Sequence, residues 1–311
     1  MKPLFFTWIF GTLAFLAACI SDTVPVSKLQ TKKVIVIVID GARYTETFGD
    51  WSQQHVPFQS QLLPNAVLHR HFYNEGTTNT TNGHAAITTG YYENLTNTGL
   101  ESPQNPSLFQ LFFEATQNPT VAALVCSKDK LEVLKNCKHK RWKDKYLVQS
   151  LCGNAGLGTG YCSDSLTFER AKYVIAIQQP DFLVVNFKEP DYSAHTSTWD
   201  AYLKGLHASD SLAVALVNFI YAQPSYAGQT AIFITNDHGR HSTNVADGFH
   251  SHGCSCEGCR HIQLISMGPD FHKGVFIDQK AGLTDLHATI AYLLKLPYSS
   301  AQGRVLHELW Q

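Results

Sequence analysis

The chain has 311 residues, of which 44% are hydrophobic and 16% are charged, and its formal net charge is −1. This length allows one large α/β domain or two small ones, with enough apolar residues for a sizeable core. The balanced charge argues against a nucleic-acid scaffold as a partner. There is also no long charged run of the kind that forms a solvated tail.

The N-terminus has the pattern of a targeting segment. Lys2 is followed by an apolar run from Leu4 to Ala18, which is too short for a comfortable membrane span. The run ends in Leu-Ala-Ala-Cys, which resembles the lipobox of bacterial lipoproteins and implies a lipid on Cys19.

We therefore expect a lipoprotein signal peptide over residues 1–18 and a polar tether over 19–32. A catalytic domain would follow over 33–311, and the protein would be anchored to the membrane in the bacterial cell envelope. Ile20, rather than Asp, follows the cysteine, which favours the outer membrane in a Gram-negative cell. An ordinary signal peptide is the alternative, and it also implies export.

Strand-like and helical segments alternate along the rest of the chain. In chain order we expect a strand at Val34–Ile39, helices at Gly83–Thr89 and Pro106–Ala115, a strand at Val121–Val125, a helix at Ser163–Ile177, a strand at Phe182–Phe187, a helix at Thr198–Tyr221, strands at Ala231–Thr235 and His261–Met267, and a helix at Thr284–Leu294. This alternation predicts an α/β fold, a three-layer α/β/α sandwich around a mainly parallel sheet.

Carboxylates and imidazoles follow the ends of several predicted strands, where α/β sheets bind their ligands. Both groups are ligands for zinc-like ions, and together they are numerous enough for a two-metal site. The candidate ligands are Asp40, Asp191, His195, Asp237, His238 and His252. Each also has a structural interpretation, since a lone Asp after a strand often caps a turn and a lone His is usually a surface or core group.

A hydroxyl-rich turn at Thr77–His84 lies between the first and second of these motifs. A hydroxyl beside two metal ions is a candidate nucleophile, since coordination lowers its pKa. The threonines of the turn are equally suited to cap a helix. The two roles are compatible, because the positive end of a helix dipole also attracts anionic substrate oxygens.

Seven of the eight cysteines follow Cys19, an odd number. In an exported protein such cysteines often pair, and two pairs are close in sequence. For the dense cluster near residue 256, a disulfide is favoured over a zinc knuckle, because three sulfurs lack a clear fourth ligand. The pairs considered are Cys126–Cys137, Cys152–Cys162 and, in the cluster that also contains Cys254, Cys256–Cys259.

The ordered motifs TTNTTNGHAAITTG, EPDYSAH, NDHG and HG, after the first Asp, resemble those of the alkaline phosphatase superfamily. The match is closest to type I phosphodiesterase/nucleotide pyrophosphatase-like members and spans residues 33–311. The resemblance implies that Thr80 is the nucleophile and that Asn97 is the nearest candidate for the family's oxyanion asparagine. It also implies two metal sites: Asp40, Thr80, Asp237 and His238 around one ion, and Asp191, His195 and His252 around the other. Such mixed nitrogen and oxygen ligands suit zinc, and the short chain leaves little room for a large cap.

The resemblance implies an exported two-metal phosphoesterase that acts on small phosphorylated substrates through a covalent phospho-threonine, with phosphodiesters or nucleotides favoured. A phosphomonoesterase or phosphonate hydrolase is the first alternative, and extra cationic contacts, for which Arg43 and Lys188 are candidates, would favour monoesters. A non-catalytic metal-binding surface lipoprotein is the second. The chain lacks the C/S-x-P-x-R motif that sulfatases of the superfamily need, which argues against a sulfatase.

Overall fold

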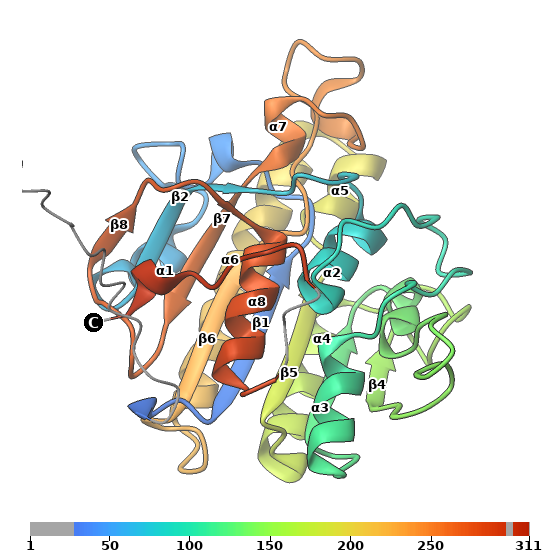
Figure 1. The fold of residues 1–311 in the computed structure, drawn as a ribbon. Coiled ribbons are helices and arrows are strands. Elements are labelled where there is room, and N and C mark those ends of the chain that lie inside the picture. The colour runs from blue at the N-terminus through green and yellow to red at the C-terminus, as the bar shows by residue number, and fades with distance from the viewer. Residues whose placement is uncertain (1–27, 297–300, 311) are drawn as a thin grey trace, which may run out of the picture.

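A single nine-stranded sheet forms the centre of the computed structural model, which describes residues 28–296 and 301–310 (Figure 1). The strands are β1 (Lys33–Ile39), β2 (Val67–Tyr73), β3 (Ala122–Cys126), β4 (Gln149–Cys152), β5 (Phe182–Phe187), β6 (Thr230–Thr235), β7 (His261–Met267), β8 (Val275–Ile277) and β9 (Ala281–Gly282). Their order is β4-β3-β5-β1-β6-β7-β2-β8, and β9 pairs with β2. Only β7 runs antiparallel to its neighbours, so the mainly parallel sheet is confirmed.

The expected signal peptide and the lipid attachment at Cys19 lie outside the described residues. Within the described part of the chain, no helix is both long and apolar enough to cross a bilayer.

Helices cover both faces of the sheet. They are α1 (Pro57–Ser60), α2 (Thr80–Thr89), α3 (Leu108–Thr116), α4 (Asp164–Tyr173), α5 (Asp191–Thr196), α6 (Trp199–Tyr221), α7 (Glu257–Arg260) and α8 (Leu283–Leu293). The valines of β1 share a buried core with α2, α3 and α8, and the isoleucines share the opposite core with α4 and α6. Because successive strand residues point to opposite faces, the continuous apolar run of β1 serves both cores, which gives the predicted three layers.

The predicted elements correspond closely to the observed ones. Phe182–Phe187 and His261–Met267 are strands with the predicted bounds, and the helix predicted from Gly83 begins three residues earlier, at Thr80. The helix predicted at Ser163–Ile177 is α-helical to Tyr173 and continues as a π-helix over Val174–Gln178.

Four strands were not predicted: β2, β4, β8 and β9. The longest of these, β2, has the sequence VLHRHFY, with exposed polar residues in its middle and an irregular register against β7. It lacks both the continuous apolar run of a buried strand and a clean alternation. The other three have only two to four residues, too few to show a period.

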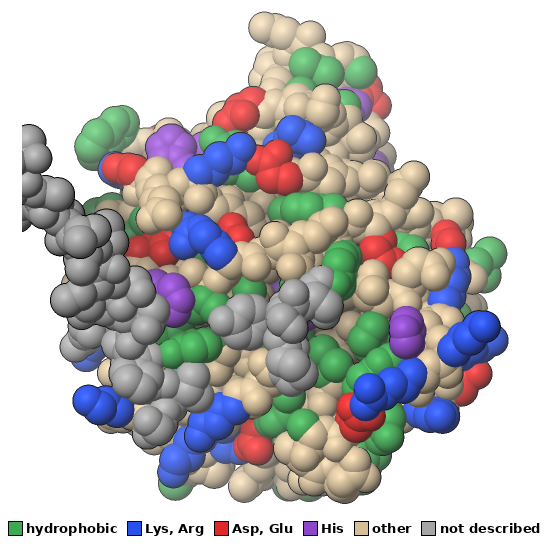
Figure 2. Space-filling model, in the orientation of Figure 1, with side chains coloured by type: hydrophobic (Ala, Val, Ile, Leu, Met, Phe, Trp, Pro, Cys, Tyr) green, Lys and Arg blue, Asp and Glu red, His purple; other side chains and the backbone are tan. Residues whose placement is uncertain are grey.

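The surface carries charges of both signs. Figure 2 shows basic and acidic side chains interspersed over the face in view, as the net charge of −1 would lead one to expect. The segment that carries α7 projects from the top of the molecule in Figure 1. It begins after β6 and returns to the sheet at β7.

Candidate metal centre

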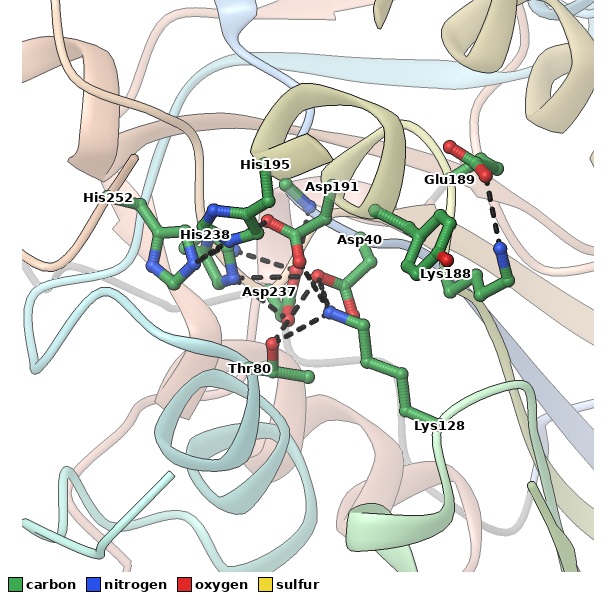
Figure 3. A network of polar contacts seen from close by, with 12 residues as sticks. Asp40, Thr80, Lys128, Lys188, Glu189, Asp191, His195, Asp237, His238 and His252 are labelled. Atoms are coloured by element: carbon green, nitrogen blue, oxygen red, sulfur yellow. Dashed lines mark hydrogen bonds and ion pairs between the residues drawn. The ribbon is translucent and has the colours of Figure 1, made fainter. Parts of the chain in front are cut away.

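The carboxyl ends of the parallel strands meet in a buried cluster of polar side chains (Figure 3). Asp40 follows β1 directly, Asp191 begins α5 after β5, and Asp237 lies two residues past β6. The backbone N–H of Asp191 donates to the carbonyl of Asp40 at 3.1 Å, which joins two of these strand ends. The seven side chains expected to hold metals all lie in or around this cluster: Asp40, Thr80, Asp191, His195, Asp237, His238 and His252.

Helix α2 presents Thr80 to the cluster from its first turn. The N-cap is Asn79, whose side-chain oxygen accepts from the backbone N–H of Asn82 at 3.0 Å, so none of the four threonines considered as caps has this role. The helix packs closely against the loop after β6, since a Cβ on Gly83 would lie 2.3 Å from the carbonyl oxygen of Asp237. Only glycine permits this approach, which brings Thr80 to within 3.5 Å of Asp40.

Asp40, Asp237 and His238 form a fully buried group of hydrogen-bond acceptors. His238 Nδ1 donates to the carbonyl of Gly239 at 2.8 Å, so its Nε2 carries a lone pair. That Nε2 lies 3.5 Å from both Asp40 Oδ1 and Asp237 Oδ2, and neither Nε2 nor Oδ2 has a hydrogen-bond partner among the described residues. Burial lowers the pKa of His238 to about 3, which keeps the ring neutral. Two buried acceptors that face each other without a hydrogen bond fit a bound cation, and Asp40 Oδ1, which accepts from Lys128, lies 3.5 Å from one of them, His238 Nε2.

Asp191, His195 and His252 form the second group. The Nε2 atoms of the two imidazoles lie 3.0 Å apart, and they lie 3.3 Å and 3.5 Å from Asp191 Oδ1. His252 Nδ1 donates to the carbonyl of Thr78 at 2.9 Å, which leaves its Nε2 free to ligate, and burial lowers its pKa to about 4. Ligands at zinc distances of about 2.0–2.1 Å are about 3.4 Å apart in a tetrahedral site, so this spacing also fits a metal. The side chain of His195 is 40% exposed, so this group faces the solvent.

Lys128 is the principal residue that sequence reasoning missed. Its fully buried ammonium donates to Asp191 at 2.6 Å, to Asp40 at 2.9 Å and to Thr80 Oγ1 at 3.0 Å, and so joins the two groups. Burial alone would lower the pKa of Lys128, but Asp191, Asp40 and Asp237 together raise it above the usual lysine value. A signal was present in the sequence, because Lys128 lies two residues past β3 at the same edge of the sheet.

Arg240 is the second missed residue and a fully buried one. Its guanidinium donates to Asp191, to the carbonyl of His250 at 2.7 Å and to His195 Nδ1 at 3.3 Å. Burial acts to raise the pKa of Asp191, but Lys128, His195 and Arg240 hold it well below its usual range. Three carboxylates and two cations leave the centre with a net negative charge, which favours a bound divalent ion.

Asn97 lies beside the first turn of α2. Its side-chain oxygen accepts from the backbone N–H of Thr81 at 3.1 Å, from the Thr81 hydroxyl at 3.0 Å and from Lys130 Nζ at 3.0 Å. These three donors fix the orientation of the amide, so its NH2 group is the part available to a substrate. Burial and the charge of Lys128 lower the pKa of Lys130 to about 8.

Neither cation considered from the sequence points into the centre. Arg43 pairs with Glu46 at 2.7 Å and donates to the carbonyl of His241 at 2.9 Å. Lys188 pairs with Glu189 at 3.1 Å, to one side of the cluster in Figure 3. The cationic contacts of the centre come instead from Lys128 and its neighbours.

The cysteine pairing expected from the sequence does not occur in the structure. Cys126 faces Cys152 across adjacent strands, because the parallel register of β3 and β4 brings them together. In the dense cluster, the sulfurs of Cys254 and Cys259 are 3.7 Å apart, against about 2.05 Å in a disulfide. All seven described cysteines are free thiols, so the expected pairs Cys126–Cys137, Cys152–Cys162 and Cys256–Cys259 are corrected.

The fold has relatives among solved structures. The lipoteichoic acid synthase LtaP from Listeria monocytogenes matches with a TM-score of 0.66 and 13% identity, over 91% of this chain and 77% of that one. Murine ectonucleotide pyrophosphatase/phosphodiesterase 5 with AMP matches with a TM-score of 0.64 and 13% identity, over 90% of this chain and 100% of that one. A phosphonate monoester hydrolase from Silicibacter pomeroyi matches with a TM-score of 0.63 and 14% identity, over 89% of this chain and 76% of that one. At these identities the likeness concerns the fold.

The sequence itself matches one protein family. A comparison with curated protein sequences gave no match. The family model of the Metalloenzyme superfamily matches residues 32–298, most of the chain and all of the residues of the centre. The chain therefore belongs to the metalloenzyme superfamily of alkaline phosphatase-like, metal-dependent hydrolases.

Proposed function

We propose that this chain hydrolyses phosphate esters, with phosphodiesters of nucleotide type favoured, and that Thr80 is the nucleophile. One observation carries the proposal. The buried Asp237 Oδ2 and His238 Nε2 lie 3.5 Å apart with no hydrogen bond to either atom among the described residues. Asp40 Oδ1 lies 3.5 Å from both His238 Nε2 and Thr80 Oγ1. A divalent cation that satisfied those acceptors would therefore lie close to the hydroxyl.

Two ions fit the ligands that the fold brings together. We assign Asp40, Thr80, Asp237 and His238 to one ion and Asp191, His195 and His252 to the other, and the mixed nitrogen and oxygen donors suit zinc. When bound, such ions lower the pKa of a hydroxyl and neutralise charge on the attacking and leaving oxygens. The neutral forms of His238 and His252, which burial favours, are the forms that ligate metals.

The chain's own residues position the nucleophile and the transferred group. Lys128 donates to Thr80 Oγ1 at 3.0 Å, and its ammonium stabilises negative charge on that oxygen as the proton leaves. The N-terminus of α2 and the amide NH2 of Asn97 offer donors to the phosphoryl oxygens. The Thr80 Oγ1–phosphorus bond forms as the bond to the leaving oxygen breaks. Water then cleaves the Thr80 Oγ1–phosphorus bond and regenerates the threonine hydroxyl. The product is a phosphate monoester when the substrate is a diester, and inorganic phosphate when it is a monoester.

Two of the structural relatives support this substrate class, although a sulfatase from Pseudoalteromonas sp. has the same fold. The murine pyrophosphatase/phosphodiesterase was solved with AMP as an inactive variant in which a threonine is replaced by alanine. A phosphomonoesterase is the second candidate, because Lys128 donates to Thr80, Lys130 donates to Asn97, and monoesters carry more negative charge than diesters. The Silicibacter pomeroyi relative is named for phosphonate monoesters, which makes phosphonates the third class to test.

The nucleophile is tested by Thr80→Ala on metal-loaded protein. We expect a loss of turnover by several orders of magnitude with most of the metal retained, while the neighbouring controls Thr78→Ala and Thr81→Ala stay active. An acid-quenched reaction of the unmodified protein should give a phosphorylated peptide that contains Thr80. Near wild-type turnover in Thr80→Ala would overturn the assignment.

The substrate class is tested with a panel of aryl phosphate monoesters, aryl phosphate diesters, phosphonates and sulfates. The highest kcat/KM on the diesters would support a phosphodiesterase, and the highest kcat/KM on the monoesters would support a phosphomonoesterase. Metal binding without turnover of any of these esters would support the non-catalytic alternative.

The ligand assignment is tested by zinc analysis of two variants. Asp237→Ala and His195→Ala should each lose about one equivalent of zinc, because we place them on different ions. Retention of both ions in both variants would show that the assignment is wrong.

We also propose that the chain is exported and attached to the membrane through a lipid on Cys19. The support is the apolar run that ends in Leu-Ala-Ala-Cys near the N-terminus. Cys19→Ser should move the protein from the membrane fraction to the soluble fraction and abolish incorporation of labelled fatty acid. Labelling of the Cys19→Ser protein equal to that of the unmodified protein would exclude this attachment.

A further inference from the structure

A second cluster of ligand-type side chains lies in the projecting segment between β6 and β7, outside the centre described above. A ring nitrogen of His241 and the sulfurs of Cys254 and Cys259 all lie within 4.8 Å of one another. The two sulfurs are 3.7 Å apart. Two thiolates on one tetrahedral zinc, with bonds of about 2.3 Å, are about 3.8 Å apart. The spacing therefore matches two ligands of one ion and is far too long for a disulfide.

His241 supplies the fourth ligand that the sequence pattern did not reveal. Its Nδ1 donates to the carboxylate of Asp247 at 2.9 Å, and its side chain is only 11% exposed. A carboxylate partner on one ring nitrogen fixes the tautomer and leaves Nε2 with the lone pair for a ligand bond. Metal-binding histidines commonly have such a partner.

Cys256 is the third thiol of this segment, although its sulfur is not one of the three ligand atoms that lie within 4.8 Å of one another. It lies between Cys254 and Cys259 in sequence, and its backbone N–H donates to the Cys254 sulfur at 3.3 Å. The thiolate form of Cys256 can bind a metal.

We propose that His241, Cys254 and Cys259 bind one zinc ion, and that Cys256, in the same loop, supplies the remaining ligand of a structural Cys3His site. Its donor set of three sulfurs and one nitrogen is that of closed structural zinc sites and differs from the nitrogen and oxygen set of the catalytic centre. The proposal does not rest on the proposed function, because none of these four residues belongs to the catalytic centre.

The site would hold two metal-ligand loops together. His241 comes three residues after His238, and Cys254 comes two residues after His252. The two loops are already joined by backbone hydrogen bonds, of which that from Gly239 N–H to the Cys259 carbonyl is 2.8 Å. They pack so closely that a Cβ on Gly239 would lie 2.0 Å from a carbonyl oxygen of the other loop. An ion bound across this junction would fix the positions of both catalytic histidines.

The test is a zinc count on the full chain, purified without strong chelators. Cys259→Ser should lose about one equivalent of zinc per chain, while the matched control Cys137→Ser, a buried cysteine outside the cluster, should lose none. Equal zinc contents in Cys259→Ser and the unmodified protein would overturn the proposal.

A second measurement needs no variant in the cluster. The cobalt-substituted protein should show thiolate-to-cobalt charge-transfer bands, and these should persist in Asp237→Ala, which is altered only in the catalytic centre. Absence of the bands, or a Cys256–Cys259 cross-link in peptide maps of the non-reduced protein, would refute the site. Because neither readout is hydrolytic activity, failure of the proposed function would leave this result intact.

Discussion

Replacement of Lys128 by methionine tests how the buried charges of the centre balance. The ammonium lies 2.6 Å from a carboxylate oxygen of Asp191 and 2.9 Å from one of Asp40, with no exposure to solvent to screen them. At an effective dielectric constant of about 20, each contact gives a gross attraction of about 6 kcal/mol. Desolvation of the buried charges offsets most of this, and removal of one partner from a buried ion pair typically costs about 3–5 kcal/mol. We expect Lys128→Met to lower the free energy of unfolding of the metal-free protein by about that amount.

The assay is urea unfolding, carried out once with a chelator and once with excess zinc. Bound divalent ions neutralise the same carboxylates, so the loss of stability should be clearly smaller with zinc than with the chelator. Turnover should fall by about 10²–10³ with zinc present, the usual effect of removing one donor to a developing negative charge. Lys204→Met is the control, because its ammonium pairs with Asp200 at 2.7 Å on the solvent-exposed surface of α6, and it should leave the unfolding free energy nearly unchanged.

Equal unfolding free energies for Lys128→Met and the unmodified protein in the chelator would refute this reasoning. An equal loss of stability with and without zinc would show that the ions do not approach the carboxylates that Lys128 contacts.

Two further predictions concern helix α2 and its partner α8. Gly83→Ala should lower zinc content and turnover together, because the added Cβ would lie 2.3 Å from the backbone carbonyl oxygen of Asp237 and would displace the Asp237 side chain with it. A zinc content equal to that of the unmodified protein would contradict this. Burial lowers the pKa of His287 in α8 to about 4, below the 6.5 expected for the unfolded chain, so the unfolded state binds more protons between these values. Stability should therefore be fully present above pH 6.5 and fall by about 3 kcal/mol as the pH drops to about 4. His287→Leu should flatten that slope in denaturant unfolding, and an unchanged slope would exclude His287 as its origin.

Much of the fold could be predicted because its signals are local. The apolar runs of β1 and β5 identify strands buried on both faces, and the helical spacing after residue 198 identifies α6. Strand β2 could not be found in this way, since its exposed residues His71 and Arg70 break the apolar pattern. It is a strand because β7 supplies a hydrogen-bonding partner from almost 200 residues later in the chain.

The candidate ligands could be found from sequence for a related reason. A carboxylate directly after a buried strand lies at the edge of a parallel sheet, so the position of Asp40 follows from the strand before it. The residues that were missed have no comparable sequence pattern around them. Lys128 and Arg240 are ordinary basic residues in the sequence, and only their complete burial against carboxylates reveals what they do.

The sequence by itself determined five of the nine described strands, the longer helices and the motifs at the strand ends, because these depend on neighbours a few residues apart. Only the tertiary structure decided which distant side chains form ion pairs and which could bind the same ion. The register of β3 and β4 places Cys126 opposite Cys152 rather than near Cys137, and the return of the chain after β6 brings His241 to the cysteines that lacked a fourth ligand. Such contacts depend on which distant segments of the backbone pack together, and the spacing of residues along the chain does not encode that.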